Sequence, residues 1–197
     1  MQSSKKFNFL YKGIISHLDW AAILKLKLKL FLLRTIGRVN RNIPTVELNQ
    51  QGHNSKDVLI IFPQDEEEFR VAVYTFENLL INKSTCSYFF IIDVLNRNMY
   101  SFFNNNTTVL NFKKNLNNEI KINNRRELLN SNFDIIVDLN TTFNYNCSRF
   151  VETMPSKLKI GFKSNFSDLF YNVQLDASSA NVIESLYKKI YSMVLSV

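Results

Sequence analysis

Length and composition describe a chain that can fold around one core. It has 197 residues, of which 46% are hydrophobic and 13% aromatic; this excludes the disordered class and fits one domain with an appended segment. The charge is uneven, because residues 1–46 hold nine of the 24 basic residues and one of the 17 acidic ones, a net of +8, which leaves −1 for the rest. Electrostatic attraction of an anionic partner therefore belongs to this N-terminal segment, which we call the arm (residues 1–46).

The few cysteines and histidines limit the chemistry. Two cysteines make no disulfide framework, the first residues show no signal-peptide pattern, and no uncharged apolar run reaches about 18 residues. We therefore expect a cytoplasmic protein, attached peripherally at the inner face of the membrane if it meets one. The two histidines, His17 and His53, lie in the arm and in a linker over residues 47–56. No zinc pattern is available, and we expect neither a metal nor a cofactor.

The arm contains alternating leucine and lysine, ILKLKLKLFLLR, at residues 23–34. As a strand, this run would place leucines on one face and lysines on the other. Leucine and lysine favour helix, however, and Gly37 is a plausible terminator, so we predict a helix over residues 20–37. At 100° per residue such a helix has two apolar faces, separated by two basic edges. The residues that we expect to contact a partner are Lys25, Lys27, Lys29, Phe31, Leu32, Arg34 and Arg38.

Each apolar face of this helix must be covered. One face can pack within the chain, and the other can meet an anionic membrane surface, a partner protein or a helix of its own chain. Nucleic acid ranks third, since it would attract the charge but not the leucines. The two faces are Leu24, Leu28, Phe31 and Leu32 on one side, and Ala22, Leu26, Leu30 and Leu33 on the other.

From residue 57 onward, short apolar runs alternate with helical spacing. Continuous apolar strands indicate a sheet that is covered on both faces, and strands alternating with helices indicate parallel βαβ units. We therefore predict an α/β fold for residues 57–197, a three-layer Rossmann-like domain with a mostly parallel sheet, preceded by the basic helical arm. The expected strands are 57–62, 88–93, 108–112, 133–139, 158–162 and an edge strand within 170–175; the expected helices are 66–80 and 180–195.

The glycines exclude two nucleotide-binding motifs. Of four glycines in the chain, only Gly161 lies within residues 57–197. A dinucleotide fingerprint or a P-loop needs several glycines between a strand and a helix, so neither is present. In the first strand–helix turn, Asp65 is instead spaced to cap the helix, with Glu68 three residues later.

Polar residues follow three of the predicted strands. Ligands of parallel α/β sheets meet the carboxyl ends of strands, where Asp65, Asp93, Asp138 and Asn140 are expected. These oxygens could bind a ligand or serve as a general base, but Asp and Asn also cap loops for purely local reasons. Their spacing has no metal signature. Cys147 has no histidine nearby in the sequence to activate it and is expected to be inert.

Three runs of the sequence resemble one enzyme family. The run FDIIVDLN at 133–140, a following helix, KLKIGF at 157–162 and FYN at 170–172 are similar to the later part of the N-terminal domain of heptosyltransferase-type glycosyltransferases. VLIIFP at 58–63 would match that domain's first βα unit. The resemblance implies a GT-B fold, of which this would be the acceptor-side half, and implies Asp65 as the counterpart of the catalytic base.

The sequence also departs from this family. The first turn lacks the family's glycine, and the family's second domain, which binds the sugar nucleotide, has no counterpart in residues 1–197. We therefore expect a degenerate, non-catalytic glycosyltransferase-like domain that acts as a binding or scaffold protein. Its arm would dock a membrane surface or a partner protein. The alternative is a glycosyltransferase component in cell-envelope sugar transfer that requires a separate donor-binding subunit.

Overall fold

The computed structural model describes residues 20–37, 57–81, 86–99, 107–113, 128, 132–179 and 182–196. The chain divides into two compact units, residues 1–40 and 41–197. The predicted linker at 47–56 and the predicted contact residue Arg38 lie outside the described residues, so the expected domain boundaries stay predictions.

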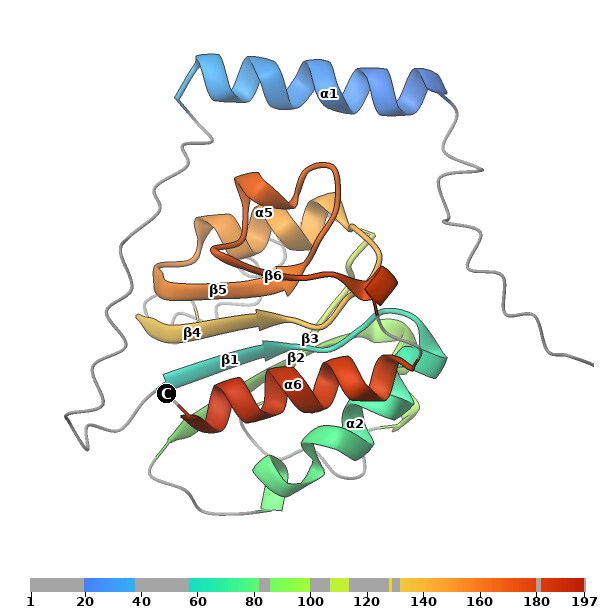
Figure 1. The fold of residues 1–197 in the computed structure, drawn as a ribbon, viewed down its shortest axis with the longest axis vertical. Coiled ribbons are helices and arrows are strands. Elements are labelled where there is room, and N and C mark those ends of the chain that lie inside the picture. The colour runs from blue at the N-terminus through green and yellow to red at the C-terminus, as the bar shows by residue number, and fades with distance from the viewer. Residues whose placement is uncertain are drawn as a thin grey trace, which may run out of the picture. The chain divides into compact units, whose positions relative to one another are not determined.

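The second unit is built on a sheet of six strands (Figure 1). All five strand pairs are parallel, which confirms the predicted α/β class. The strand order is β3-β2-β1-β4-β5-β6, so the chain runs outward from β1 in one direction and then outward from β4 in the other. The strands are β1 (Asp57–Ile61), β2 (Ser87–Asp93), β3 (Thr107–Leu110), β4 (Phe133–Asp138), β5 (Ser156–Phe162) and β6 (Val173–Leu175).

Helices cover both faces of this sheet. Helices α2 (Glu66–Ile81) and α6 (Ile183–Ser196) lie together on one face, and α5 (Tyr145–Thr153) lies on the other (Figure 1). Three short 3-10 helices complete the described part: η1 (Val94–Met99), η2 (Ser167–Leu169) and η3 (Ala177–Ser179).

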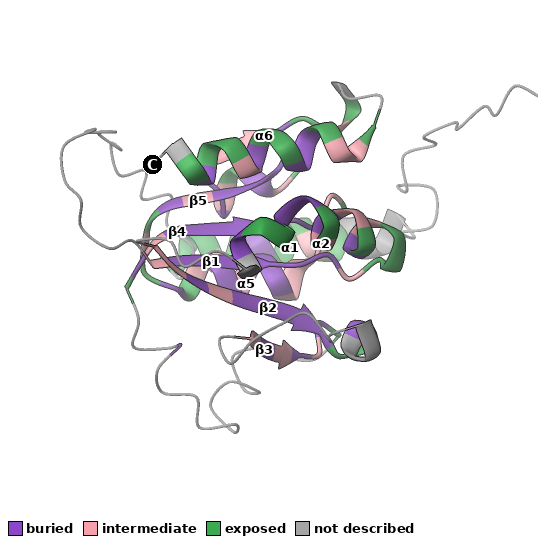
Figure 2. Ribbon diagram, turned by 90° about the horizontal axis from the view of Figure 1, so that it is seen from below, coloured by how far each residue is buried: buried purple, intermediate pink, exposed green. Residues whose placement is uncertain are grey.

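The central strands are buried from end to end, as continuous apolar runs require. Leu59, Ile60 and Ile61 of β1 have no exposed surface, although their side chains alternate between the two faces of the sheet (Figure 2). On the sheet face that α2 and α6 cover, the ring of Phe62 lies 5.6 Å from that of Phe69 and 6.1 Å from that of Phe90. These tilted contacts are typical of aromatic packing in a core.

The third predicted strand ends earlier than expected, because a hydrogen bond takes the backbone out of the ladder. It was expected to continue to Phe112, but the Phe112 N–H donates to the Asp93 carboxylate at 2.8 Å. The edge strand was expected within 170–175, and β6 lies within that range. Before it, the Tyr171 N–H donates to the Ser167 carbonyl at 3.0 Å.

Helix α1 (Trp20–Thr35) confirms the choice of helix over strand in the arm. The Gly37 N–H donates to the Arg34 carbonyl at 3.0 Å, and Gly37 has a φ of 72°, a left-handed conformation that favours glycine. Within the described part of the chain, every helix is too short or too polar to cross a membrane.

Candidate functional site

β2 and β3 are added on one side of β1, and β4, β5 and β6 on its other side, so the strand order reverses between β1 and β4. In open α/β sheets such a switch point leaves a crevice at the carboxyl ends of the strands, where ligands usually bind. Two turns flank it here: the β1–α2 turn at residues 62–65 and the β4–α5 turn at residues 139–144. The candidate site is therefore built from the side chains of these two turns.

Two buried asparagines hold the β1–α2 turn from its two sides. The Asn96 side chain, from η1, donates to the carbonyls of Pro63 at 3.1 Å and Gln64 at 3.3 Å. The Asn140 side-chain oxygen, which follows β4, accepts from the Gln64 N–H at 3.0 Å. Asn144 adds a weaker contact to the Gln64 side chain at 3.5 Å. The switch point is thus crossed by hydrogen bonds of the chain itself.

The N-termini of both adjoining helices are capped by their own side chains. Asp65 accepts from the N–H groups of Glu67 and Glu68, each at 3.0 Å, which confirms it as the N-cap of α2. Asn144 caps α5 in the same way, accepting from Asn146 and Cys147 at 3.0 and 3.1 Å. These N–H groups are the ones that bind phosphate in nucleotide sites. Here they are occupied.

Glu68 joins α2 to the β4–α5 turn. Its carboxylate accepts a short hydrogen bond from the Thr141 hydroxyl and a longer one, 3.5 Å, from the Thr141 N–H. Burial raises the pKa of Glu68 above its ordinary value of 4.5, the bonds from Thr141 oppose that rise, and the nearby charge of Asp65 adds to it. Burial therefore disfavours the ionised form of Glu68.

Asp138, at the end of β4, accepts hydrogen bonds on both of its carboxylate oxygens. One oxygen accepts from the backbone N–H and side chain of Asn140, at 3.0 and 2.7 Å. The other accepts from the Tyr171 hydroxyl at 2.5 Å and the Cys147 thiol at 3.3 Å. Because the phenol has a single hydrogen, which Asp138 receives, Ser148 must donate to the Tyr171 oxygen at 2.9 Å.

Burial keeps the thiol and the phenol of this cluster protonated. It raises the pKa of both Cys147 and Tyr171 well above their ordinary values, and the negative charge of Asp138 raises them further. The nucleophilic form of cysteine is the thiolate. Cys147 is therefore a hydrogen-bond donor inside the fold, consistent with the expected inert cysteine.

Gly161 explains how Tyr171 reaches Asp138. A Cβ atom at this position of β5 would lie 2.7 Å from two carbons of the Tyr171 ring, a distance that packed atoms do not adopt. The ring thus lies directly on the bare backbone of β5. The one glycine predicted within the body serves close packing of a side chain and not the approach of a phosphate.

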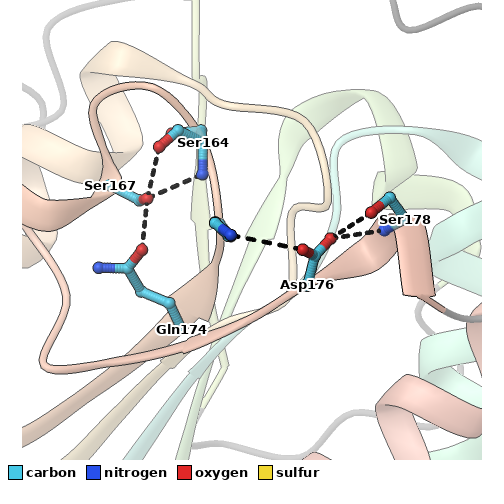
Figure 3. A network of polar contacts seen from close by, with 6 residues as sticks. Ser164, Ser167, Gln174, Asp176 and Ser178 are labelled. Atoms are coloured by element: carbon cyan, nitrogen blue, oxygen red, sulfur yellow. Dashed lines mark hydrogen bonds and ion pairs between the residues drawn. The ribbon is translucent and has the colours of Figure 1, made fainter.

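The β5–β6 loop that carries Tyr171 is held by its own polar network (Figure 3). The Ser167 hydroxyl accepts from the Ser164 N–H at 2.8 Å and donates to the Gln174 side chain at 2.7 Å. Asp176 accepts from the N–H and hydroxyl of Ser178, at 3.0 and 2.6 Å, and pairs with Lys163 at 3.5 Å. The first set of contacts ties the loop to β6, and the second ties Lys163, after β5, to residues that follow β6.

Each of the four predicted site residues is hydrogen-bonded within the chain. Asp138 and Asn140 are bonded to each other, and Asp65 caps α2. Asp93 is fully buried and accepts from the N–H groups of Leu95 and Phe112, both at 2.8 Å. Among the residues that the structure describes, no cluster of three metal-ligating side chains occurs. The sequence missed Gln64, Asn96, Thr141 and Tyr171, and it missed the bonds of Glu68 to Thr141, because these roles depend on contacts between distant segments.

The large apolar side chains on the two sides of α1 differ in exposure. Leu30 is 4% exposed, and its neighbours Leu26 and Leu33 are half-buried. On the other side, four large apolar side chains are 50–63% exposed: Leu24, Leu28, Phe31 and Leu32. Lys25, Lys27, Lys29 and Arg34 are exposed beside them.

Comparison with known proteins identifies the fold. No family model matches the sequence, and no curated protein matches it. Among solved structures, E. coli heptosyltransferase WaaC with ADP has a similar fold, with a TM-score of 0.50 and 12% sequence identity. The match covers 71% of this chain and 47% of the enzyme, so the chain spans about half its length. The similarity confirms a Rossmann-like, glycosyltransferase-like α/β fold.

Removal of the Tyr171 hydroxyl should weaken the cluster around Asp138. Tyr171→Phe keeps the ring on Gly161 but takes one donor from a buried carboxylate, so we expect the free energy of unfolding to fall by about 1–3 kcal/mol. Urea denaturation measures this. The control is Tyr74→Phe, at a side chain that is 70% exposed on α2. Equal stability of the two variants would show that the Tyr171–Asp138 bond contributes nothing.

The raised pKa of Glu68 predicts a pH dependence of stability. A carboxyl whose folded pKa exceeds 4.5 binds its proton more tightly in the folded state, so its stabilising contribution is present below that value. It is lost as pH rises through the folded pKa. Glu68→Gln removes the titration, and its stability relative to wild type should therefore increase between about pH 4 and pH 7. If the difference in stability between Glu68→Gln and wild type stays constant over this pH range, the desolvation of Glu68 is contradicted. Glu67→Gln is the exposed control.

Proposed function

We propose that this chain is a non-catalytic glycosyltransferase-like domain that acts as a binding or scaffold protein, held at an anionic membrane surface by its basic arm. The observation that carries the proposal is the exposed apolar face of α1 with basic residues beside it. Helices that lie in a membrane interface have this composition. We place the protein at the cytoplasmic face, where anionic lipids attract basic segments.

The hydrogen bonds at the switch point support the non-catalytic part of the proposal. Asp65 caps α2, and Asp93 and Asp138 accept from donors of the chain on both of their oxygens. A general base must instead be within reach of a substrate proton. The N–H groups at the starts of α2 and α5 are likewise bonded internally, which leaves little to hold a phosphate.

The charge distribution supports a membrane over a nucleic acid. The arm carries +8 and the rest of the chain −1. Anionic lipid contributes about 1 kcal/mol for each basic residue near the surface. A lipid surface also covers leucine and phenylalanine side chains, whereas a nucleic-acid backbone rewards only the charge. Nucleic-acid binding through the arm remains the third candidate.

A second candidate is a glycosyltransferase component that works with a separate donor-binding subunit. The similarity in fold to a heptosyltransferase with ADP favours it. In that case Asp65, which is exposed at the β1–α2 turn, would serve as the base.

The membrane proposal predicts charge-dependent binding to vesicles. Replacing Lys25, Lys27 and Lys29 together by glutamine should weaken binding by about 3 kcal/mol, because each basic residue contributes about 1 kcal/mol. Flotation with phosphatidylglycerol-containing vesicles should then lose the protein, and wild type should not float with pure phosphatidylcholine.

The matched control removes three lysines from the body. Lys157, Lys163 and Lys188 have side chains that are 80%, 66% and 63% exposed, and their replacement by glutamine should leave flotation unchanged. Equal loss in both triple variants, or none in either, would contradict docking through α1. Binding of the arm to another protein in the absence of vesicles would instead identify a partner protein as the target of the arm.

The non-catalytic proposal predicts no turnover of nucleotide-activated sugars by the isolated chain. The measurement is the release of nucleoside diphosphate. Asp65→Asn is the variant, and Asp168→Asn is an exposed control. Turnover that Asp65→Asn abolishes and Asp168→Asn does not would overturn the non-catalytic proposal.

A further inference from the structure

Helices α2 and α6 form one outer layer of the second unit. They lie side by side over the same face of the sheet and run in the same direction (Figure 1). The ring of Phe76 lies 5.7 Å from that of Tyr191, so these two residues mark the same level along the two helices. Both helices have an exposed side that faces away from the sheet. We call these two exposed sides together the α2–α6 surface.

The two halves of the α2–α6 surface carry opposite charge. The ionisable residues there are Glu66, Glu67, Arg70 and Glu77 on α2, and Glu184, Lys188 and Lys189 on α6. Three acids and one base give α2 a net charge of −2, and two bases and one acid give α6 a net charge of +1. Among the described residues, the ion pairs of this surface stay within one helix, at 2.5 Å in α2 and 2.6 Å in α6.

Glu77 and Lys189 lie at the two outer edges of this surface. Glu68, which interacts with a side chain of α6, and Tyr191, which packs on α2, mark the sides of the helices that face each other. At 100° per residue, Glu77 is about 180° from Glu68 and Lys189 is about 160° from Tyr191. Each is within two residues of the Phe76–Tyr191 contact, so the two opposite charges lie at a similar level, one on each edge.

Large apolar side chains are exposed between these edges. Tyr74 of α2 is 70% exposed, and Leu195 of α6 is 55% exposed. The hydrogen bond and the charge of Glu184 raise the pKa of Lys188, and Tyr74 raises it further, which places Tyr74 beside α6. An apolar centre with charged groups at its edges is the usual composition of a contact between proteins.

We propose that the α2–α6 surface binds the same surface of a second copy of this chain. In a two-fold pair whose axis runs between the helices and parallel to them, α2 of each copy lies on α6 of the other. Glu77 then meets the second copy's Lys189, the contact occurs twice, and the two Tyr74 side chains lie near the axis. A partner with one sign of charge would be repelled by one of the two helices, whereas a second copy matches both.

Charge reversal at the two edges tests this pairing in the full chain. Sedimentation equilibrium without lipid measures the dissociation constant of the dimer. Glu77→Lys and Lys189→Glu should each raise it roughly tenfold, because each change replaces two attractive contacts by two repulsive ones. An equimolar mixture of the two variants should recover the wild-type constant, since both contacts are attractive again in the mixed dimer.

The matched control reverses a charge outside the α2–α6 surface. Lys157, on β5, has a side chain that is 80% exposed, and Lys157→Glu should leave the dissociation constant unchanged. Circular dichroism checks that each variant is folded. Wild type that stays monomeric at about 100 μM would overturn the proposal. A dimer that both reversals leave intact, or that the mixture does not restore, would overturn it as well, because association would then use another surface.

Discussion

A carboxylate without exposed surface must have its oxygens satisfied by donors, since a buried unpaired charge costs several kcal/mol. Asp138 meets this requirement with four donors from three segments: the turn after β4, the first turn of α5 and the β5–β6 loop. Their positions are consequently fixed relative to β4. Much of the carboxyl edge of the sheet follows from this one group, including the placement of Tyr171 on Gly161.

The same edge shows which groups of the chain meet at the switch point of this α/β sheet. The strand order still reverses between β1 and β4, as it does in nucleotide-binding sheets. The turn there contains no glycine, and asparagine side chains bond the backbone groups that would otherwise face a ligand. A shared topology therefore does not by itself fix the groups that stand at the switch point.

How much could be predicted depended on whether a feature is local. Continuous apolar runs identified the strands, three- and four-residue spacing identified α2, and a short-range capping pattern identified Asp65. The bond from Tyr171 to Asp138 spans 33 residues and has no local signature. The same holds for the donors that Phe112 gives to Asp93 and that Cys147 gives to Asp138.

The contact between Gly161 and Tyr171 has an evolutionary consequence. A side chain at position 161 is tolerated only when the ring at 171 is absent or displaced, and loss of the ring removes a donor from Asp138. The three positions should therefore covary in related sequences, with the aromatic hydroxyl and the aspartate lost together once the glycine changes. Such a triplet would trace descent of this domain at identities where overall alignment fails.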